Sequence, residues 1–298
     1  MTASQPRLGL SCALTTPFLP DGSVDLARFT AHARSRLEAG CTSVTICGTT
    51  GEGASLGLPS RERMLGALRD AGLDLRHSVV VGMAASSVEE ALAQVKQAAA
   101  FDCRTLLLPP PFYFKDATED GLAAWFGLVL DRVAGENLRA ILYHIPSVTA
   151  VPLSIALIGR LKERFPSTVQ GVKDSSGDRD YARSLLVYHR DLMIIVGDER
   201  RLADAVRMGA SGAISGLANI VPDLMLPLAN DGRDDSRISA LVDEVLKYPV
   251  TPAVKELVAH ETGDAAWRNV APPLSPLTND EATRLTAAFD AIVQRAAA

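Results

Sequence analysis

The sequence predicts a closed (β/α)8 barrel with a C-terminal helical extension. Three observations support this fold class. The chain has 298 residues, near the length of about 250 that a single barrel of this kind takes. Eight short apolar runs alternate with stretches of helical spacing, which predicts βα units and a parallel sheet. No GxGxxG motif follows the first run, as it would in an open dinucleotide-binding sheet, so closure is favoured.

The apolar runs have the composition of strands that are buried on both faces. Ser78-Val79-Val80-Val81-Gly82 and Leu192-Met193-Ile194-Ile195-Val196 are almost continuously apolar, as expected of parallel strands that helices cover. The candidate strands are Leu10–Leu14, Ser43–Cys47, Ser78–Met83, Thr105–Leu108, Arg139–Tyr143, Val169–Lys173, Met193–Val196 and Gly212–Ser215.

Helical spacing occurs between these strands and after the last one. Candidate helices among the βα units are Leu26–Leu37, Val88–Ala100, Leu122–Val133, Ala156–Phe165 and Leu202–Met208. From about Pro222 the strand pattern stops, and the candidate helices are Ile238–Leu246, Ala253–His260 and Glu281–Ala297. We therefore expect a barrel over residues 1–221 and a helical extension over 222–298 that packs on it.

Composition excludes several classes of protein. A hydrophobic fraction of 47% with 22% charged residues is typical of a chain that buries a large core. The net charge is −5 and the basic residues are scattered, so we expect no nucleic acid partner. The apolar stretch 141–159 contains two prolines and a histidine, which a membrane helix tolerates poorly, and 1–9 lacks a signal sequence. We expect a cytoplasmic protein without a membrane contact.

The four cysteines form no CxxC pair, and three of them lie in or beside apolar runs. This distribution is typical of buried free thiols rather than of disulfides or a zinc site. We expect no metal ion.

Active sites of (β/α)8 barrels lie at the carboxyl ends of the strands, so polar residues there are the first candidates. Lys173 ends the sixth run, at the rim of an apolar barrel. Desolvation there would favour the neutral amine, which is the form that attacks a ketone. A structural ion pair of Lys173 with Asp174 or Glu52 is an equally open interpretation.

The second strand is followed by Gly48-Thr49-Thr50-Gly51-Glu52. A tight turn with exposed N–H groups and two hydroxyls can hold a carboxylate. A simple βα turn with a threonine helix cap is the alternative. Together with Lys173, the turn favours a 2-oxo acid, because such a molecule carries a carboxylate next to its ketone.

Tyr143 ends the fifth strand, where a phenol could transfer the protons that imine formation requires. A packed barrel tyrosine is the alternative. His144 should point the opposite way because side chains alternate along a strand, and we expect it to be structural.

These motifs resemble those of the dihydrodipicolinate synthase and N-acetylneuraminate lyase family over nearly the whole chain. The matching segments, in the order and approximate spacing of the family, are Thr16-Pro17-Phe18, Gly48-Thr49-Thr50-Gly51-Glu52, Tyr143-His144-Ile145-Pro146-Ser147, Gly171-Val172-Lys173-Asp174, Gly197-Asp198 and Gly212-Ala213-Ile214-Ser215.

The resemblance implies the role of each site residue. Lys173 would form an imine with pyruvate or a related 2-oxo acid, Tyr143 would relay protons and Thr49 would orient that tyrosine. Thr50, together with neighbouring groups such as Gly48 and Ile214, would bind the substrate. The resemblance also implies a homotetramer made of two dimers and no cofactor.

Tyr113, in Pro110-Pro111-Phe112-Tyr113, matches the tyrosine that an adjacent subunit contributes in synthases of this family. Loop packing is the alternative for this residue.

One position departs from the synthases. They have an arginine, which binds the carboxylate of aspartate semialdehyde, where this chain has Val148. Valine cannot pair with a carboxylate. After the seventh strand, Glu199 and Arg200 match the region that contacts the polar substrate tail in sialic acid lyases. A helix N-terminus capped by Asp198 is the alternative there.

The function that these residues predict is a Schiff-base-forming lyase or aldolase. It would make or break a C–C bond next to a 2-oxo acid, or dehydrate a sugar-derived 2-oxo acid. One alternative is 4-hydroxy-tetrahydrodipicolinate synthase. An alternative of another class is a non-catalytic protein that binds a 2-oxo acid, which the presence of Lys173, Tyr143 and both threonines disfavours.

Overall fold

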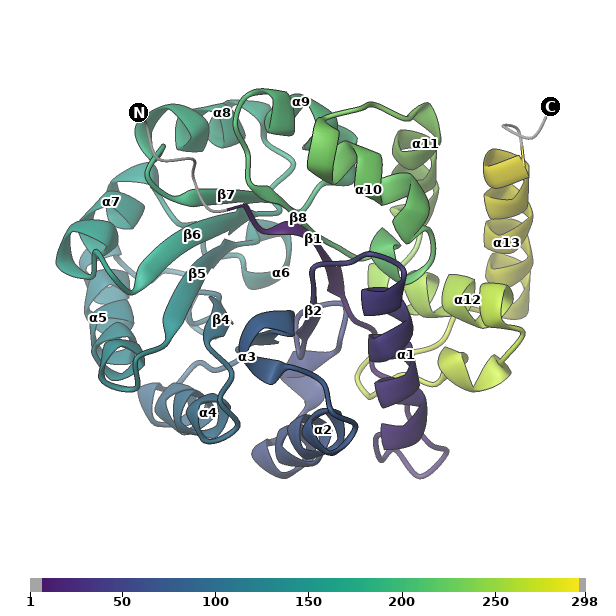
Figure 1. The fold of residues 1–298 in the computed structure, drawn as a ribbon, viewed down its shortest axis with the longest axis horizontal. Coiled ribbons are helices and arrows are strands. Elements are labelled where there is room, and N and C mark those ends of the chain that lie inside the picture. Colours follow the sequence, from purple (N-terminus) through teal and green to yellow (C-terminus); the bar gives the residue numbers. More distant parts are fainter. Residues whose placement is uncertain (1–6, 295–298) are drawn as a thin grey trace.

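The computed structural model describes residues 7–294, in which eight parallel strands form a closed barrel (Figure 1). Each strand pairs with the next one along the chain, and β8 pairs with β1. The strands are β1 (Gly9–Ala13), β2 (Ser43–Ile46), β3 (Val79–Gly82), β4 (Thr105–Leu108), β5 (Arg139–His144), β6 (Val169–Asp174), β7 (Met193–Val196) and β8 (Gly212–Ser215). The predicted fold class is confirmed, and each predicted strand agrees with the structure to within one residue at either end.

Helices surround the barrel (Figure 1). The helices that follow β1 to β7 are α1 (Leu26–Glu38), α2 (Leu58–Asp70), α3 (Leu75–Ser78), α4 (Val88–Ala100), α5 (Glu119–Gly135), α6 (Pro146–Thr149), α7 (Ile155–Arg164), α8 (Arg179–Tyr188) and α9 (Leu202–Arg207). After β8 come α10 (Pro222–Asp231), α11 (Ser236–Val245), α12 (Val250–Thr262) and α13 (Asn279–Gln294). The predicted helix Glu281–Ala297 corresponds to α13, and its last residues lie outside the described range.

Alternation along the strands separates the barrel interior from the layer beneath the helices. The interior cluster contains Val80, Leu107, Ile141, Tyr143 and Ile195, one or more from each of several strands. Their neighbours in sequence pack outward against the helices, which is why the strands read as continuous apolar runs. At the seam between β8 and β1, Gly212 has φ +125°, and a Cβ there would lie 2.0 Å from the Gly9 carbonyl oxygen. Only glycine fits this contact.

The segment after β8 packs on the barrel. Helix α10 contacts β1, β8 and α9, and α13 packs on α11 and α12 (Figure 1, right). Helix α12 contacts the short helix η3 (Leu217–Asn219) that follows β8, so the extension reaches the carboxyl ends of the strands. The division of the chain near residue 221 stays a prediction.

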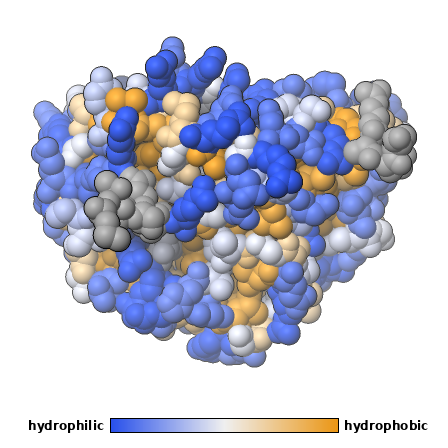
Figure 2. Space-filling view, turned by 45° about the horizontal axis from the view of Figure 1, so that its top comes forward, coloured by the Kyte–Doolittle hydropathy of each residue, from blue (hydrophilic) through white to orange (hydrophobic). Residues whose placement is uncertain are grey.

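The face of the molecule in Figure 2 is mainly polar. On the face in Figure 2, hydrophilic residues surround and interrupt the hydrophobic ones. Within residues 7–294 no helix has the length and apolar character needed to span a bilayer.

Candidate active site

Strand pairing places Lys173 beside Tyr143. Residue 143 of β5 is the register partner of residue 173 of β6, and both side chains are about 95% buried at the carboxyl end of the barrel. The Lys173 Nζ donates a hydrogen bond to the Tyr143 hydroxyl at 3.2 Å and lies 4.4 Å from the centre of its ring. An amine and a phenol that share a hydrogen bond can pass a proton between a nucleophile and a reacting oxygen.

The next register pair, His144 and Asp174, belongs to the outer face of the barrel wall. The His144 ring stacks on Tyr181, and its Nδ1 accepts a hydrogen bond from the Leu153 N–H at 3.0 Å. Burial lowers the pKa of His144 to about 4, so the ring is neutral at pH 7. These contacts are those of a structural side chain, as the alternation predicted.

The turn after β2 has a strained backbone that only certain residues allow. Cys47 and Glu52, at its two ends, both have positive φ values near 55°. A Cβ on Gly53 would lie 1.8 Å from the Cys47 carbonyl oxygen, so glycine is required there. The Thr16 hydroxyl donates to the Gly51 carbonyl oxygen at 2.7 Å. The turn therefore has a fixed shape that points Thr49 and Thr50 toward the barrel opening.

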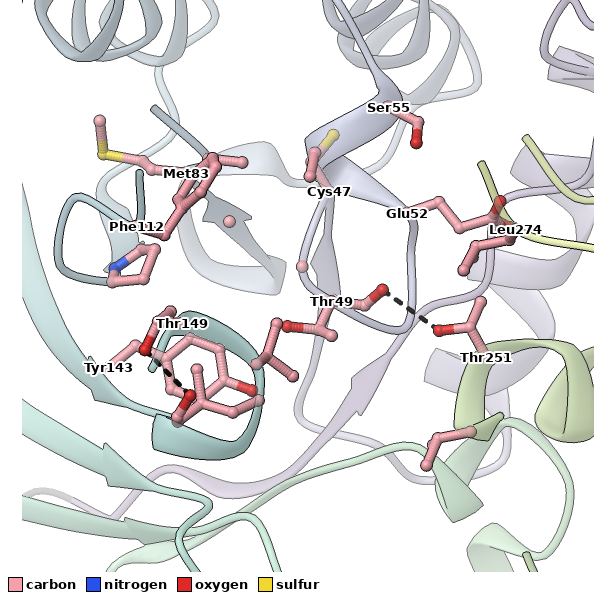
Figure 3. Close-up of a pocket in the computed structure, with 18 of the residues that line it drawn as sticks. Cys47, Thr49, Glu52, Ser55, Met83, Phe112, Tyr143, Thr149, Thr251 and Leu274 are labelled. Carbon is pink, nitrogen blue, oxygen red and sulfur yellow. Dashed lines mark hydrogen bonds between the residues drawn. The ribbon is translucent and has the colours of Figure 1, made fainter. Parts of the chain in front are cut away.

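Two adjoining cavities, of about 440 and 340 Å³, open at this end of the barrel and share Thr49, Tyr143, Ile145, Val148 and Val250. The larger one is mostly apolar, and Figure 3 shows Tyr143, Thr49 and Phe112 around it. The smaller one contains Lys173. Between them, the cavities bring together nine predicted site residues, which are Gly48, Thr49, Thr50, Tyr143, Val148, Lys173, Glu199, Arg200 and Ile214.

Tyr113 is the predicted residue that the chain does not bring to these cavities. Its side chain is 73% exposed and packs edge-on against Phe114, which is also exposed. The neighbouring Phe112 lines the larger cavity. Tyr113 therefore lies at the rim, on the surface of the single chain.

Thr49 lies close to Tyr143 in the cavity wall, but within the described residues its hydroxyl makes no hydrogen bond to that tyrosine. The Thr49 carbonyl oxygen accepts from the Glu52 N–H at 3.0 Å and from the Thr251 hydroxyl at 3.4 Å (Figure 3). The orienting role of Thr49 stays a prediction.

Glu199 and Arg200 differ in how many partners bind their charged groups. Glu199 follows β7, where its Oε1 accepts a hydrogen bond from the Ser215 hydroxyl at 2.6 Å. Burial raises the pKa of the Glu199 carboxyl, and nearby Lys173 opposes that shift. The Arg200 guanidinium is bound by Asp198, at 2.7 Å, and by Asp243 of α11, at 2.8 Å. Asp198 also caps the short helix η2 (Glu199–Arg201), as the alternative interpretation proposed.

Lys173 forms an ion pair with neither Glu52 nor Asp174, the two partners that the sequence left open. Glu52 binds Lys255 of α12 instead, and Asp174 accepts from the Ser176 N–H. Sequence reasoning missed Lys255, although a lysine in the apolar stretch Pro252-Ala253-Val254-Lys255 was a usable signal. It also missed Val250 and Thr251, which bring the C-terminal extension into the cavity wall.

Potential metal ligands are distributed over the part of the chain that the structure describes. Across residues 7–294, no three or more His, Cys, Asp or Glu side chains cluster in a way that could hold a metal ion. All four cysteines are buried free thiols.

Comparisons with known proteins agree with this fold. A family model described as the dihydrodipicolinate synthetase family matches residues 6–292. An uncharacterized DapA-like lyase from Chloroflexus aurantiacus is 33% identical over 298 residues, which cover 97% of this chain and 98% of the relative.

Two solved structures are similar over nearly the full length. Dihydrodipicolinate synthase from Agrobacterium tumefaciens is 48% identical, with a TM-score of 0.93, and the match covers 96% of this chain and 99% of that chain. YagE, a prophage protein from Escherichia coli K12 in complex with pyruvate, is 23% identical, with a TM-score of 0.87 and coverage of 96% and 98%. The second likeness concerns the fold alone.

Proposed function

We propose a reaction for this chain from the premise that it belongs to the dihydrodipicolinate synthetase family and is a lyase or aldolase of the kind that forms a lysine Schiff base. In this proposal Lys173 is the nucleophile, and it attacks the ketone of pyruvate or of a related 2-oxo acid. The hydrogen bond between Lys173 and Tyr143 is the observation that supports the assignment most strongly.

The proposed steps use these two residues in turn. The neutral amine adds to the ketone, and Tyr143 passes a proton to the oxygen, which leaves as water when the imine forms. In the retro-aldol direction the C4 hydroxyl loses its proton and becomes the carbonyl of the released aldehyde, while the electron pair of the broken C–C bond passes to the protonated imine and gives an enamine. Protonation of the enamine carbon restores the imine, and water hydrolyses it to release the 2-oxo acid and free Lys173. In a dehydration no C–C bond breaks, because the imine of the intact substrate loses a C3 proton and the resulting enamine expels the protonated C4 hydroxyl as water.

The substrate carboxylate lies, in this proposal, against the turn Gly48–Glu52. Thr50 and Ile214 line the cavity that contains Lys173, and Thr49 lines both cavities. Hydroxyls and N–H groups in such a turn hold an anion without a cationic side chain. YagE was solved in complex with pyruvate, which supports this class of ligand by analogy of fold.

The second substrate, or the distal part of a longer 2-oxo acid, carries no anionic group in our proposal. Val148 replaces the arginine of the synthases, and Arg200 is already bound by Asp198 and Asp243. Lys115 donates to the Phe112 and Thr149 carbonyl oxygens, so it is also engaged. Glu199 would accept hydrogen bonds from hydroxyl groups of a neutral tail.

The second candidate is 4-hydroxy-tetrahydrodipicolinate synthase. The 48% identity to the Agrobacterium tumefaciens synthase favours it. The engagement of Arg200 and Lys115 near Val148 opposes it, because the aldehyde of that reaction carries a carboxylate that needs a cationic partner.

We also propose that the chain acts as a homotetramer in which Tyr113 of one subunit completes the site of another. The exposure of Tyr113 and Phe114 beside the cavity rim supports this arrangement. A cytoplasmic location stays a prediction.

A screen for pyruvate release tests the proposed substrate class. The purified chain is incubated with 2-oxo acids whose tails are neutral polyols, and with matched compounds that end in a carboxylate. Turnover of the neutral compounds alone supports the proposal, whereas preference for the dianionic compounds contradicts it.

A further inference from the structure

A fully buried ion pair joins the C-terminal extension to the turn after β2. The Lys255 Nζ of α12 lies 2.6 Å from the Glu52 Oε1, and neither side chain is exposed to solvent. The second carboxylate oxygen, Oε2, accepts from the Ala271 N–H at 2.6 Å. Both oxygens of Glu52 are therefore bound by groups from the last 44 residues of the chain, which follow β8 in the sequence.

The same lysine reaches the loop after β1. Its Nζ donates to the Thr16 carbonyl oxygen at 2.8 Å and lies 4.6 Å from the centre of the Phe18 ring. Thr16 in turn donates its hydroxyl to the Gly51 carbonyl oxygen. Lys255 thus holds the turn at two points, through Glu52 directly and through Thr16 and Gly51.

The turn after β2 has hydrogen bonds of its own, from the Glu52 N–H to the Thr49 carbonyl oxygen and from the Gly53 N–H to the Gly48 carbonyl oxygen, but its last residue has a strained backbone. Glu52 adopts φ 57°, a left-handed conformation that costs a non-glycine residue free energy. In Figure 3, Glu52 lies between the turn with Thr49 and the segment with Leu274. A buried ion pair is seldom more stabilising than apolar side chains of similar volume, so stability alone explains this pair poorly.

We propose that Glu52 and Lys255 are positioning residues, through which the C-terminal extension holds the turn Gly48–Glu52 in the shape that binds the carboxylate of the 2-oxo acid. This inference rests on the proposed function. Neither residue contacts the reacting atoms in this scheme. Lys255 also neutralises a buried carboxylate that would otherwise repel the substrate anion two residues from Thr50.

The test compares two ketones that differ in the carboxylate. Pyruvate carries one, and hydroxyacetone has a hydroxymethyl group in its place. Each ketone is titrated into the full-length chain with borohydride, and intact-mass spectrometry measures the fraction of protein that becomes labelled.

The Lys255→Met variant should need roughly 10- to 100-fold more pyruvate for half-maximal labelling, by analogy with the loss seen when groups that orient the ligands of a metal site are removed. Labelling by hydroxyacetone should stay within about twofold of wild type, because that ketone makes no use of the carboxylate site. The double variant Lys255→Met/Glu52→Gln should recover part of the pyruvate affinity, since it removes the unpaired charge and keeps an acceptor for the Ala271 N–H.

Arg28→Met is the matched control. Arg28 of α1 binds Asp264 after α12, so that variant also breaks an ion pair between the barrel and the extension, but away from the turn. It should leave both titrations unchanged. If Lys255→Met does not fold, the double variant, which leaves no unpaired carboxylate, must still bind pyruvate more weakly than wild type.

Three results would overturn the inference and leave the proposed function in place. Equal losses for pyruvate and hydroxyacetone would show a general structural role, as would a selective pyruvate loss in Arg28→Met. Wild-type affinity in the double variant, with no loss in Lys255→Met, would show no role at all. A wild-type chain that pyruvate does not label would contradict the proposed function itself, and the positioning role with it.

Discussion

Tyr143 and Lys173 are register partners on β5 and β6, and the tyrosine hydroxyl lies 3.2 Å from the lysine amine. Strand pairing, rather than a loop, sets this distance. Pairing with a neighbouring strand on both sides holds each of β5 and β6, so the amine and the phenol stay aligned without a bound substrate.

Replacement of this tyrosine tests its role as the proton relay. Tyr143→Phe should reduce kcat by roughly 10²- to 10⁴-fold, the usual range for a lost general acid–base group, with pyruvate binding largely kept. Steady-state kinetics and a pyruvate titration measure the two effects. Tyr188→Phe, at an exposed position of α8, is the control and should behave as wild type. Near-normal turnover in Tyr143→Phe would reduce that residue to a packing role.

The activity with aspartate semialdehyde, and its change when Val148 is replaced, tests whether the second substrate is anionic. Condensation of aspartate semialdehyde with pyruvate should be about 10²-fold or more slower than in an arginine-bearing synthase, because a lost charge pair costs a few kcal/mol and each 1.4 kcal/mol is about tenfold. Val148→Arg should raise this activity. A coupled assay for the cyclic product measures both chains, and efficient synthesis by the wild type would restore the synthase as the leading candidate.

Mixing of two inactive variants tests whether Tyr113 of one subunit completes the site of another. Tyr113→Phe chains and Lys173→Ala chains should each be inactive, and hybrids prepared by mixing and reassembling them should recover part of the activity. Recovery requires that one subunit supplies Tyr113 to the site of another. Unmixed variants treated in the same way are the controls. Hybrids with no activity, in preparations whose mass shows mixed oligomers, would contradict the shared site.

The buried ring of His32 predicts a loss of folding stability at low pH. Burial lowers the pKa of His32 to about 4, and its Nε2 is hydrogen-bonded to Asn219, next to β8. The unfolded chain takes up a proton near pH 6.5, whereas the folded chain does so only near pH 4. The resulting stability, about 3 kcal/mol, is therefore present above pH 6.5 and lost as the pH falls from 6.5 to 4.

His32→Gln should consequently show a smaller fall in the free energy of unfolding between pH 7 and pH 4 than wild type. Urea denaturation at several pH values measures it. His77→Gln is the control, because His77 is largely exposed. Parallel curves for wild type and His32→Gln would show that the buried ring does not control this pH dependence.

Sequence reasoning predicted the strands well because parallel strands that helices cover are continuous apolar runs, and their ends then indicated where Lys173 and Tyr143 would lie. It could not predict contacts between distant segments. Lys255 and Glu52 are 203 residues apart, and Asp243 binds Arg200 from a helix 43 residues later. The proposed role of Tyr113 involves a second chain, which no pattern within one chain specifies.

The central claim is that Lys173 forms an imine with pyruvate, and reductive trapping tests it most directly. Borohydride should convert the imine to a stable secondary amine, so intact mass should rise in the presence of pyruvate and peptide mapping should place the label on Lys173. Lys173→Ala should fold normally, by circular dichroism, and take no label. Unmodified wild-type protein, or a label on another lysine, would contradict the mechanism and leave the barrel unaffected.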